Sequence, residues 1–149
     1  MDELDQHDRD IARLLATDGR MSFTDLARAT GLSTSAAHQR VRRLEQRGVI
    51  KGYAAMIDLE SIGLPLTAFI SVSPIDPGDP DDIADRLAPL AAVEGCYSVA
   101  GDQNYILKVR VASPRALESL LSDIRSTAHV TTRTTVVLSV PFEHRPPDL

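Results

Sequence analysis

The side chains best suited to chemistry lie between residues 33 and 42, where hydroxyl, amide and guanidinium groups follow one another closely. Ser35, His38, Gln39 and Arg42 can hydrogen-bond to the edges of nucleic-acid bases. Arginine fits the two acceptors of guanine, and glutamine fits the donor and acceptor of adenine. Taken alone, a helix face rich in Arg and Gln is more often simply solvated, so its neighbours in the chain must decide between the two roles.

Short amphipathic helices are expected to position this face. An opening helix is predicted from Asp5 as its N-cap, with Ile11, Leu14 and Leu15 on one face and an end near Gly19. It is expected to pack behind the two helices that follow.

The next helix is predicted to begin after Ser22, which is a good N-cap with Asp25 three residues later, as in a near capping box. Leu26 and Ala29 would form its inner stripe.

A tight turn at Gly31 is predicted to separate this helix from the next one. Glycine readily takes the left-handed conformation that ends a helix, and Ser33 can cap the next helix at once. In that helix Ala37, Val41 and Leu44 recur at i, i+4 and i+7, which assigns them to the core. With the basic segment 47–53 that follows, this pattern predicts a winged helix-turn-helix that presents its last helix to the DNA major groove.

The charge distribution agrees with that prediction although the whole chain is acidic, with a formal net charge of −5. Residues 20–53 contain seven Arg or Lys residues and two acidic residues, so this segment is basic. A basic reading surface on an acidic body would orient the protein on a polyanion.

Twelve residues are candidate DNA contacts. Arg42 is expected to contact guanine and Lys51 to contact phosphate, and the start of the third helix at residues 33–35 can receive a phosphate. Arg40 and Arg43 lie near the edge of the core and could bind phosphate or pair with acidic residues of the opening helix. The full set is Arg20, Ser22, Thr24, Ser33, Thr34, Ser35, His38, Gln39, Arg40, Arg42, Arg43 and Lys51.

Length and composition indicate a cytoplasmic protein of two small domains. The chain has 149 residues, 43% of them hydrophobic, and no apolar run long enough to span a membrane. The lone cysteine, Cys96, excludes an intramolecular disulfide and is read as a small, partly buried residue rather than a redox-sensing thiol. The four histidines lack metal-ligand spacing. We therefore expect no metal, no cofactor and no membrane partner.

The second half of the chain alternates strands and helices. Strands are predicted at 66–72, 93–99, 105–111 and 131–140. One helix would open at Asp79-Pro80, and another would start at Ser113-Pro114 with Leu117, Leu120, Leu121 and Ile124 in its buried stripe. This βαββαβ order predicts an α+β, ferredoxin-like domain whose antiparallel sheet carries both helices on one face. The domains would be 1–53 and 66–149, joined by a hinge strand and linker at 54–65.

The second face of this sheet would be uncovered in a single chain. It would expose Thr, Ser and apolar side chains, so a second subunit is expected to cover it. A homodimer also suits DNA reading, because two recognition helices related by a two-fold axis contact two half-sites about one helical turn apart.

These motifs together resemble the Lrp/AsnC (leucine-responsive/asparagine-responsive, feast/famine) family of transcriptional regulators over nearly the whole chain. The resemblance rests on segments in the family's order and spacing: Asp5, Asp8, Ile11, Gly19-Arg20, Leu26-Ala27, Gly31-Leu32-Ser33, Arg40-Val41, Leu44-Glu45, Gly48-Val49-Ile50, Gly52-Tyr53, Val99-Ala100-Gly101-Asp102 and Tyr105.

The resemblance implies a regulator that binds promoter DNA, dimerises through its second domain and often assembles four dimers into an octamer. It also implies an amino acid or similar effector near the Gly101-Asp102 turn, where backbone amides could bind a carboxylate and Asp102 an ammonium group. Without the resemblance, a plain hairpin turn is the simpler interpretation. Several amino-acid-binding relatives have an acidic residue where this chain has Asn104. The candidate effector residues are Tyr97, Val99, Ala100, Gly101, Asp102, Asn104 and Tyr105.

Three function classes follow from the sequence. The leading one is a transcriptional regulator whose DNA affinity or assembly responds to a small metabolite. Similar architectures resemble decarboxylases of haem precursors, but residues 66–149 contain no clustered catalytic constellation, and we expect no enzyme activity. The third class is an effector-free architectural protein that wraps DNA.

Overall fold

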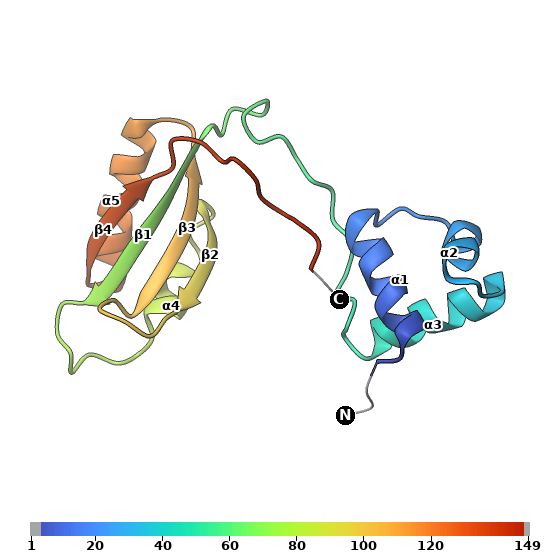
Figure 1. The fold of residues 1–149 in the computed structure, drawn as a ribbon. Coiled ribbons are helices and arrows are strands. Elements are labelled where there is room, and N and C mark those ends of the chain that lie inside the picture. The colour runs from blue at the N-terminus through green and yellow to red at the C-terminus, as the bar shows by residue number, and fades with distance from the viewer. Residues whose placement is uncertain (1–3, 148–149) are drawn as a thin grey trace. The chain divides into compact units, whose positions relative to one another are not determined.

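The computed structural model describes residues 4–147 and divides the chain into two compact units, with boundaries between Met56 and Ile57 and between Pro141 and Phe142. The first boundary lies inside the predicted linker. The predicted domains 1–53 and 66–149 also include residues 1–3 and 148–149, which lie outside the described residues. Figure 1 shows a three-helix unit and a unit in which helices pack on a sheet.

Three helices form the first unit, and each begins at a predicted cap. Asp5, Ser22 and Ser33 each accept a hydrogen bond from the backbone N–H three residues later, which satisfies an otherwise unpaired donor of the first turn. The helices are α1 (Gln6–Thr17), α2 (Phe23–Thr30) and α3 (Thr34–Gln46).

The turn between α2 and α3 confirms the role predicted for Gly31. Its φ of 69° is left-handed, and the Leu32 N–H donates to the Ala27 carbonyl at 3.0 Å. Ser33 caps α3 only two residues later, so the chain changes direction within one turn and the two helices share a core.

The core of this unit is a small cluster between the three helices. Its fully packed residues are Ile11, Leu26, Ala27, Ala37, Val41 and Leu44. The assignment of Ala29 to this core was wrong, because Ala29 is exposed and Ala27 is buried. Ala27 follows Leu26 on α2, and both side chains face the core that α2 shares with α1 and α3.

The segment after α3 folds back without forming a strand. The Val49 and Ile50 N–H groups both donate to the Leu44 carbonyl, at 2.9 and 3.2 Å. Within residues 47–65 the structure contains no strand, so the predicted hinge strand is absent from this single chain. A strand requires a hydrogen-bonded neighbour, and none of the strands of this chain pairs with the segment.

The second unit is the predicted antiparallel four-stranded sheet, in the order β2-β3-β1-β4. Figure 1 shows α4 and α5 on the same face of this sheet, which is the ferredoxin-like arrangement. The elements are β1 (Leu66–Pro74), α4 (Ile83–Leu87), β2 (Val93–Ser98), β3 (Tyr105–Val111), α5 (Pro114–Ala128) and β4 (Val130–Val136).

The core of the sheet unit lies between the strands and the two helices. Alternate residues of β3 are buried, beginning at Tyr105, and they pack with Leu117, Leu120 and Ile124 of α5. Leu121, predicted for the same stripe, is only partly buried. Ser113 caps α5 and Pro114 occupies its first turn, as predicted.

Two element boundaries differ from the prediction by three or more residues. The first helix of this unit begins at Ile83 rather than at Asp79-Pro80, because residues 76–82 form turns in which the Asp79 N–H donates to the Asp76 carbonyl. The last strand ends at Val136 rather than Val140. Its pairing with β1 reaches Ala68 opposite Val136, and one further hydrogen bond joins the Val137 N–H to the Thr67 carbonyl. Leu66, the first residue of β1, would lie opposite residue 138 in this register, so β1 offers no partner for residues 139–140.

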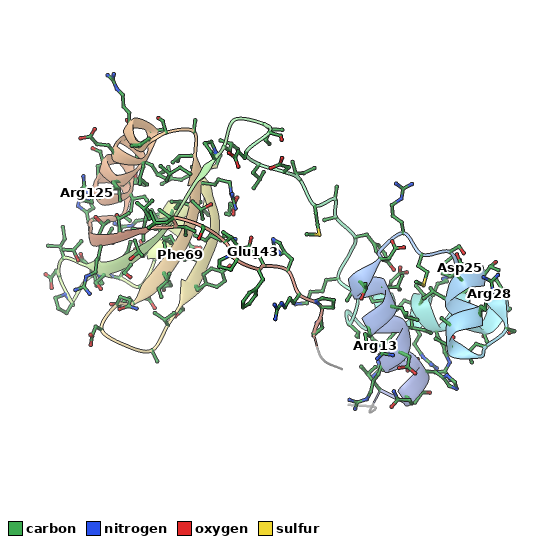
Figure 2. The ribbon with its side chains drawn as sticks, turned by 45° about the horizontal axis from the view of Figure 1, so that its top comes forward. Arg13, Asp25, Arg28, Phe69, Arg125 and Glu143 are labelled. Atoms are coloured by element: carbon green, nitrogen blue, oxygen red, sulfur yellow. The ribbon has the colours of Figure 1, made fainter. Side chains whose placement is uncertain are left out.

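The face of the sheet opposite the helices exposes large side chains. Phe69 of β1, labelled in Figure 2, is 39% exposed and Tyr97 of β2 is 54% exposed. Cys96 is also exposed rather than partly buried, and partial desolvation raises the pKa of its thiol, which does not favour a reactive thiolate.

Candidate functional site

The predicted reading residues of α3 form one exposed row. Ser35, His38, Gln39 and Arg42 are all exposed, whereas Ala37 between them is buried. The spacing of three and four residues places them along one side of the helix. Arg42 is the last long side chain of the row, one turn beyond His38 and Gln39.

The start of α3 is built around Ser33. The Ser33 hydroxyl accepts from the Ala36 N–H at 3.1 Å, so this side chain is engaged in capping. Thr34 and Ser35 are exposed beside it. The helix dipole and the exposed N–H groups of this turn favour an anion, as proposed from the sequence.

His38 has a contact that sequence reasoning missed. Its ring meets the ring of Phe23 edge to face, with centroids 4.5 Å apart and an interplanar angle of 89°. Phe23 is the first residue of α2, so this contact links the start of α2 to the reading row of α3. Nothing local in the sequence indicates this contact, because it joins side chains of two different helices.

Arg40 and Arg43 lie on another side of α3 and have acidic partners on and before α1. Arg40 contacts Asp5 at 2.7 Å and Asp8 at 2.8 Å, and Arg43 contacts Asp8 at 3.4 Å. This is the pairing that the sequence left as an alternative to phosphate binding. Hydrogen bonding from Arg40 is the main cause that lowers the pKa of Asp5, and the pairing raises the pKa of Arg40.

The basic segment after α3 is held by a tyrosine outside the predicted contact set. The Tyr53 hydroxyl donates to Glu45 Oε1 at 3.0 Å, and a Cβ at Gly19 would lie 3.3 Å from the Tyr53 ring. Desolvation and the nearby Glu45 carboxylate raise the pKa of Tyr53. Arg20, next to Gly19, and Lys51, two residues before Tyr53, are both exposed.

Ser22 and Thr24 are exposed at the start of α2. The Ser22 hydroxyl accepts from the Asp25 N–H, which caps α2, and donates to Asp25 Oδ2 at 2.8 Å, in place of the return bond from the Ser22 N–H that a full capping box has. Asp25 also pairs with Arg28 at 3.3 Å, and Figure 2 shows these two side chains together on α2. This end of the unit is therefore occupied by local pairs, with Thr24 pointing to solvent.

The second candidate site is the turn between β2 and β3. Asn104 closes the turn, because its carbonyl accepts from the Val99 N–H at 3.0 Å and its own N–H donates to the Val72 carbonyl at 3.1 Å. Ala100, Gly101 and Asp102 are exposed at the tip. A Cβ at Gly101 would meet no atom of this chain within 4 Å, so the packing of this chain does not require a glycine there.

The two tyrosines predicted for this site lie on opposite faces of the sheet. Tyr105 is buried on the helix-covered face and donates to Asp81 Oδ1 at 2.6 Å, a partner missed from the sequence. Tyr97 pairs across the strands with Ile106 and lies back over Gly95, where an added Cβ would be 2.8 Å from its hydroxyl. Neither ring therefore extends toward the tip of the turn.

The described residues contain no group of three or more His, Cys, Asp or Glu side chains arranged to hold a metal ion. In residues 4–147 no helix is both long and apolar enough to cross a membrane.

Family models match both units. Residues 4–51 match the winged helix-turn-helix DNA-binding model, and residues 67–147 match the Lrp/AsnC ligand binding domain. The chain belongs to the Lrp/AsnC family. As a family member with this DNA-binding domain, it is a transcriptional regulator and not an enzyme.

Relatives within the Lrp/AsnC family match along nearly the whole chain. The HTH-type transcriptional regulator LrpA of Mycobacterium tuberculosis is 52% identical, with 95% of each chain covered. The leucine-responsive regulatory protein of Escherichia coli is 35% identical, with 91% of this chain and 85% of that one covered. A solved structure of the M. tuberculosis feast or famine regulatory protein complexed with L-methionine has a TM-score of 0.94 at 51% identity and covers 97% of this chain and 100% of that one.

Proposed function

We propose that α3 reads promoter DNA through the exposed row Ser35, His38, Gln39 and Arg42. The observation that carries the proposal is that these four side chains are exposed together while the opposite stripe of the helix is buried. An α-helix fits the major groove, where arginine and glutamine distinguish guanine and adenine.

The remaining polar side chains divide by their surroundings. Thr24, Arg20, Arg43 and Lys51 are exposed and act on phosphates, which position the protein without reading sequence. Thr34 and the first turn of α3 receive a phosphate at the helix N-terminus. Ser22 and Ser33 contribute chiefly as caps, and Arg40 is held by carboxylates instead of by DNA.

Substitution of Arg42 and Lys51 tests this division. Arg42→Ala should lose about tenfold or more in affinity for a duplex selected by the wild-type protein, and much less for a shuffled duplex, because one bidentate base contact is lost. Lys51→Ala should weaken both duplexes alike and lower the salt slope by about one contact's worth. Arg13→Ala, an exposed arginine of α1, is the control. Equal losses on both duplexes for Arg42→Ala would reject the reading role.

The turn at residues 99–104 is the proposed site of an amino-acid effector. Two observations support it: the tip is exposed, and the packing of this chain leaves the space at Gly101 open. The structure of a relative that is 51% identical to this chain has been solved with L-methionine bound, so we propose that the effector is an α-amino acid. Val99, Ala100, Gly101 and Asp102 would form the site, with Asp102 binding the ammonium group.

Asn104 stands where several amino-acid-binding relatives have an acidic residue, and this difference affects how the site can bind an ammonium group. Its amide is neutral, so it cannot replace the carboxylate that several amino-acid-binding relatives have there, and Asp102 must supply the negative charge. Isothermal titration with L-methionine and L-leucine tests the assignment. Asp102→Asn should abolish or strongly weaken binding, whereas Asp123→Asn, on α5, should not. Unchanged binding by Asp102→Asn would move the site elsewhere.

A homodimer that covers the open sheet face, and a tetramer of dimers built from it, are the proposed assemblies. The support is the exposure of Phe69 and Tyr97 on a face that a monomer would leave in water. The cytoplasm, where promoter DNA is accessible, is the proposed compartment.

A further inference from the structure

Asp8 is a buried carboxylate in the DNA-binding unit. It lies on α1 with only 4% of its side chain exposed, whereas the other acidic residue of α1, Asp10, remains partly in solvent. An aspartate is rarely buried to this extent without compensating partners, because removal of its charge from water is costly. The partners of Asp8 therefore indicate why it occupies this place.

Both charged partners of Asp8 come from α3. Arg40 donates from Nη1 to Asp8 Oδ1 at 2.8 Å, and the same nitrogen contacts both carboxylate oxygens of Asp5 at 2.9 and 2.7 Å. Arg40 is mostly buried, at 22% side-chain exposure. Arg43 contacts the same Asp8 oxygen at 3.4 Å and is 51% exposed, so it is the looser partner. The tight connection is that between Asp8 and Arg40.

This connection constrains how α3 is turned about its axis. Arg40 lies next to Gln39 in sequence and two residues before Arg42, and each residue advances the direction of its side chain by about 100° around the helix. A fixed direction for Arg40 therefore fixes the directions of the reading row. Ala37, Val41 and Leu44 pack α3 into the core, and the short charge-assisted hydrogen bond of Arg40 adds a directional constraint on its rotation.

We propose that Asp8 is a positioning residue for DNA reading: through Arg40 it holds α3 in the rotation that presents Gln39 and Arg42 to the bases, without touching DNA itself. The inference rests on the proposed reading role of α3. It assigns Arg40 to the carboxylates of Asp5 and Asp8 and leaves Arg43 as the arginine of the pair that contacts phosphate.

The test compares Asp8→Asn with Asp10→Asn in the full-length protein. Both variants remove one negative charge from α1, but Asp10 is bonded to Gln6 and Arg13 of its own helix. Fluorescence anisotropy would measure affinity for a duplex selected by the wild-type protein and for a shuffled duplex of equal composition. Circular dichroism would verify folding.

For Asp8→Asn we expect affinity for the selected duplex to fall about tenfold while affinity for the shuffled duplex is unchanged or higher, because one acidic charge has gone. Asp10→Asn should leave the ratio of the two affinities unchanged. An unchanged ratio in folded Asp8→Asn, or equal losses on both duplexes, would overturn the proposal, since a merely structural role weakens both.

Arg40→Gln provides a second test that does not require folded Asp8→Asn. Its salt slope for shuffled DNA should equal that of the wild type, because Arg40 is bound to carboxylates and not to phosphate. A slope lower by about one contact's worth would overturn the proposal. Arg42→Ala separates the two claims. If it changes the affinity ratio and Asp8→Asn does not, only the positioning role fails; if neither changes it, the reading role of α3 fails.

Discussion

At the scale of single residues, the surroundings of like side chains separate their roles. Arg40 and Arg42 are two residues apart on one helix, yet Arg40 is held by Asp5 and Asp8 and Arg42 is exposed. Sequence identified both as basic candidates. Only the packing of α1 against α3 places one against carboxylates and the other on the reading face.

The ion pair of Asp5 predicts an acid-sensitive stability. Hydrogen bonding from Arg40, and then from the Asp8 N–H, lowers the pKa of Asp5 below its ordinary value of 3.8. A lowered pKa in the folded state means that the stabilisation is present above the unfolded pKa and is lost as pH falls through the folded one. Chemical denaturation from about pH 5 to about pH 3 should therefore cost the wild type more stability than Asp5→Asn. Parallel pH profiles would contradict this pairing.

The glycines at the two turns predict opposite results for the same substitution. Gly31 has a left-handed φ of 69°, so Gly31→Ala should lower the free energy of unfolding by about 1 kcal/mol. Gly101 is not among the glycines with positive φ and has open space around its Cβ position, so Gly101→Ala should leave thermal stability unchanged. The second variant should instead weaken amino-acid binding in a titration. Loss of stability with intact binding would contradict the effector assignment.

At the scale of elements, the start of α3 has two serines with different roles. Ser33 accepts from the Ala36 N–H, whereas Ser35 is an exposed member of the reading row. Ser33→Ala should cost about 1 kcal/mol of stability by denaturation. Ser35→Ala should leave stability nearly unchanged and alter DNA affinity. The reverse pattern would show that the two hydroxyls had been assigned the wrong roles.

Local chemistry explains which elements could be predicted. The caps of α1, α2, α3 and α5, the Gly31 turn and the apolar periodicity of α3 and α5 act within a few residues, so the sequence was sufficient to locate them. The effector role of the turn at residues 99–104 was predicted from the family resemblance, because the residues of the turn by themselves indicate only a hairpin.

Long-range partners explain what the sequence could not predict. The last strand ends at Val136 rather than Val140, because its pairing with β1 runs out at the first residues of β1. The Phe23–His38 and Tyr105–Asp81 contacts join residues 15 and 24 positions apart, and nothing local in the sequence indicates either one. The predicted strand in residues 54–65 lacks a partner strand in one chain.

At the scale of the whole molecule, assembly is the proposed route by which an effector changes DNA binding. A ligand between subunits shifts an equilibrium only by its difference in affinity for the two assemblies. Phe69→Asp places a charge on the open sheet face and should shift sedimentation toward smaller species. Glu118→Lys, a charge change on α5, is the control. An unchanged distribution for Phe69→Asp would show that this face is not the subunit interface.

The most direct test of the central claim, an amino-acid-responsive regulator that reads DNA through α3, is footprinting on the DNA upstream of its own gene. Wild-type protein and Arg42→Ala would be compared at fixed salt, with and without L-methionine and other amino acids, while assembly size is followed. The account predicts protection at intervals of about one helical turn that changes with one amino acid and is lost in Arg42→Ala. Protection that ignores every amino acid and survives in Arg42→Ala would contradict it.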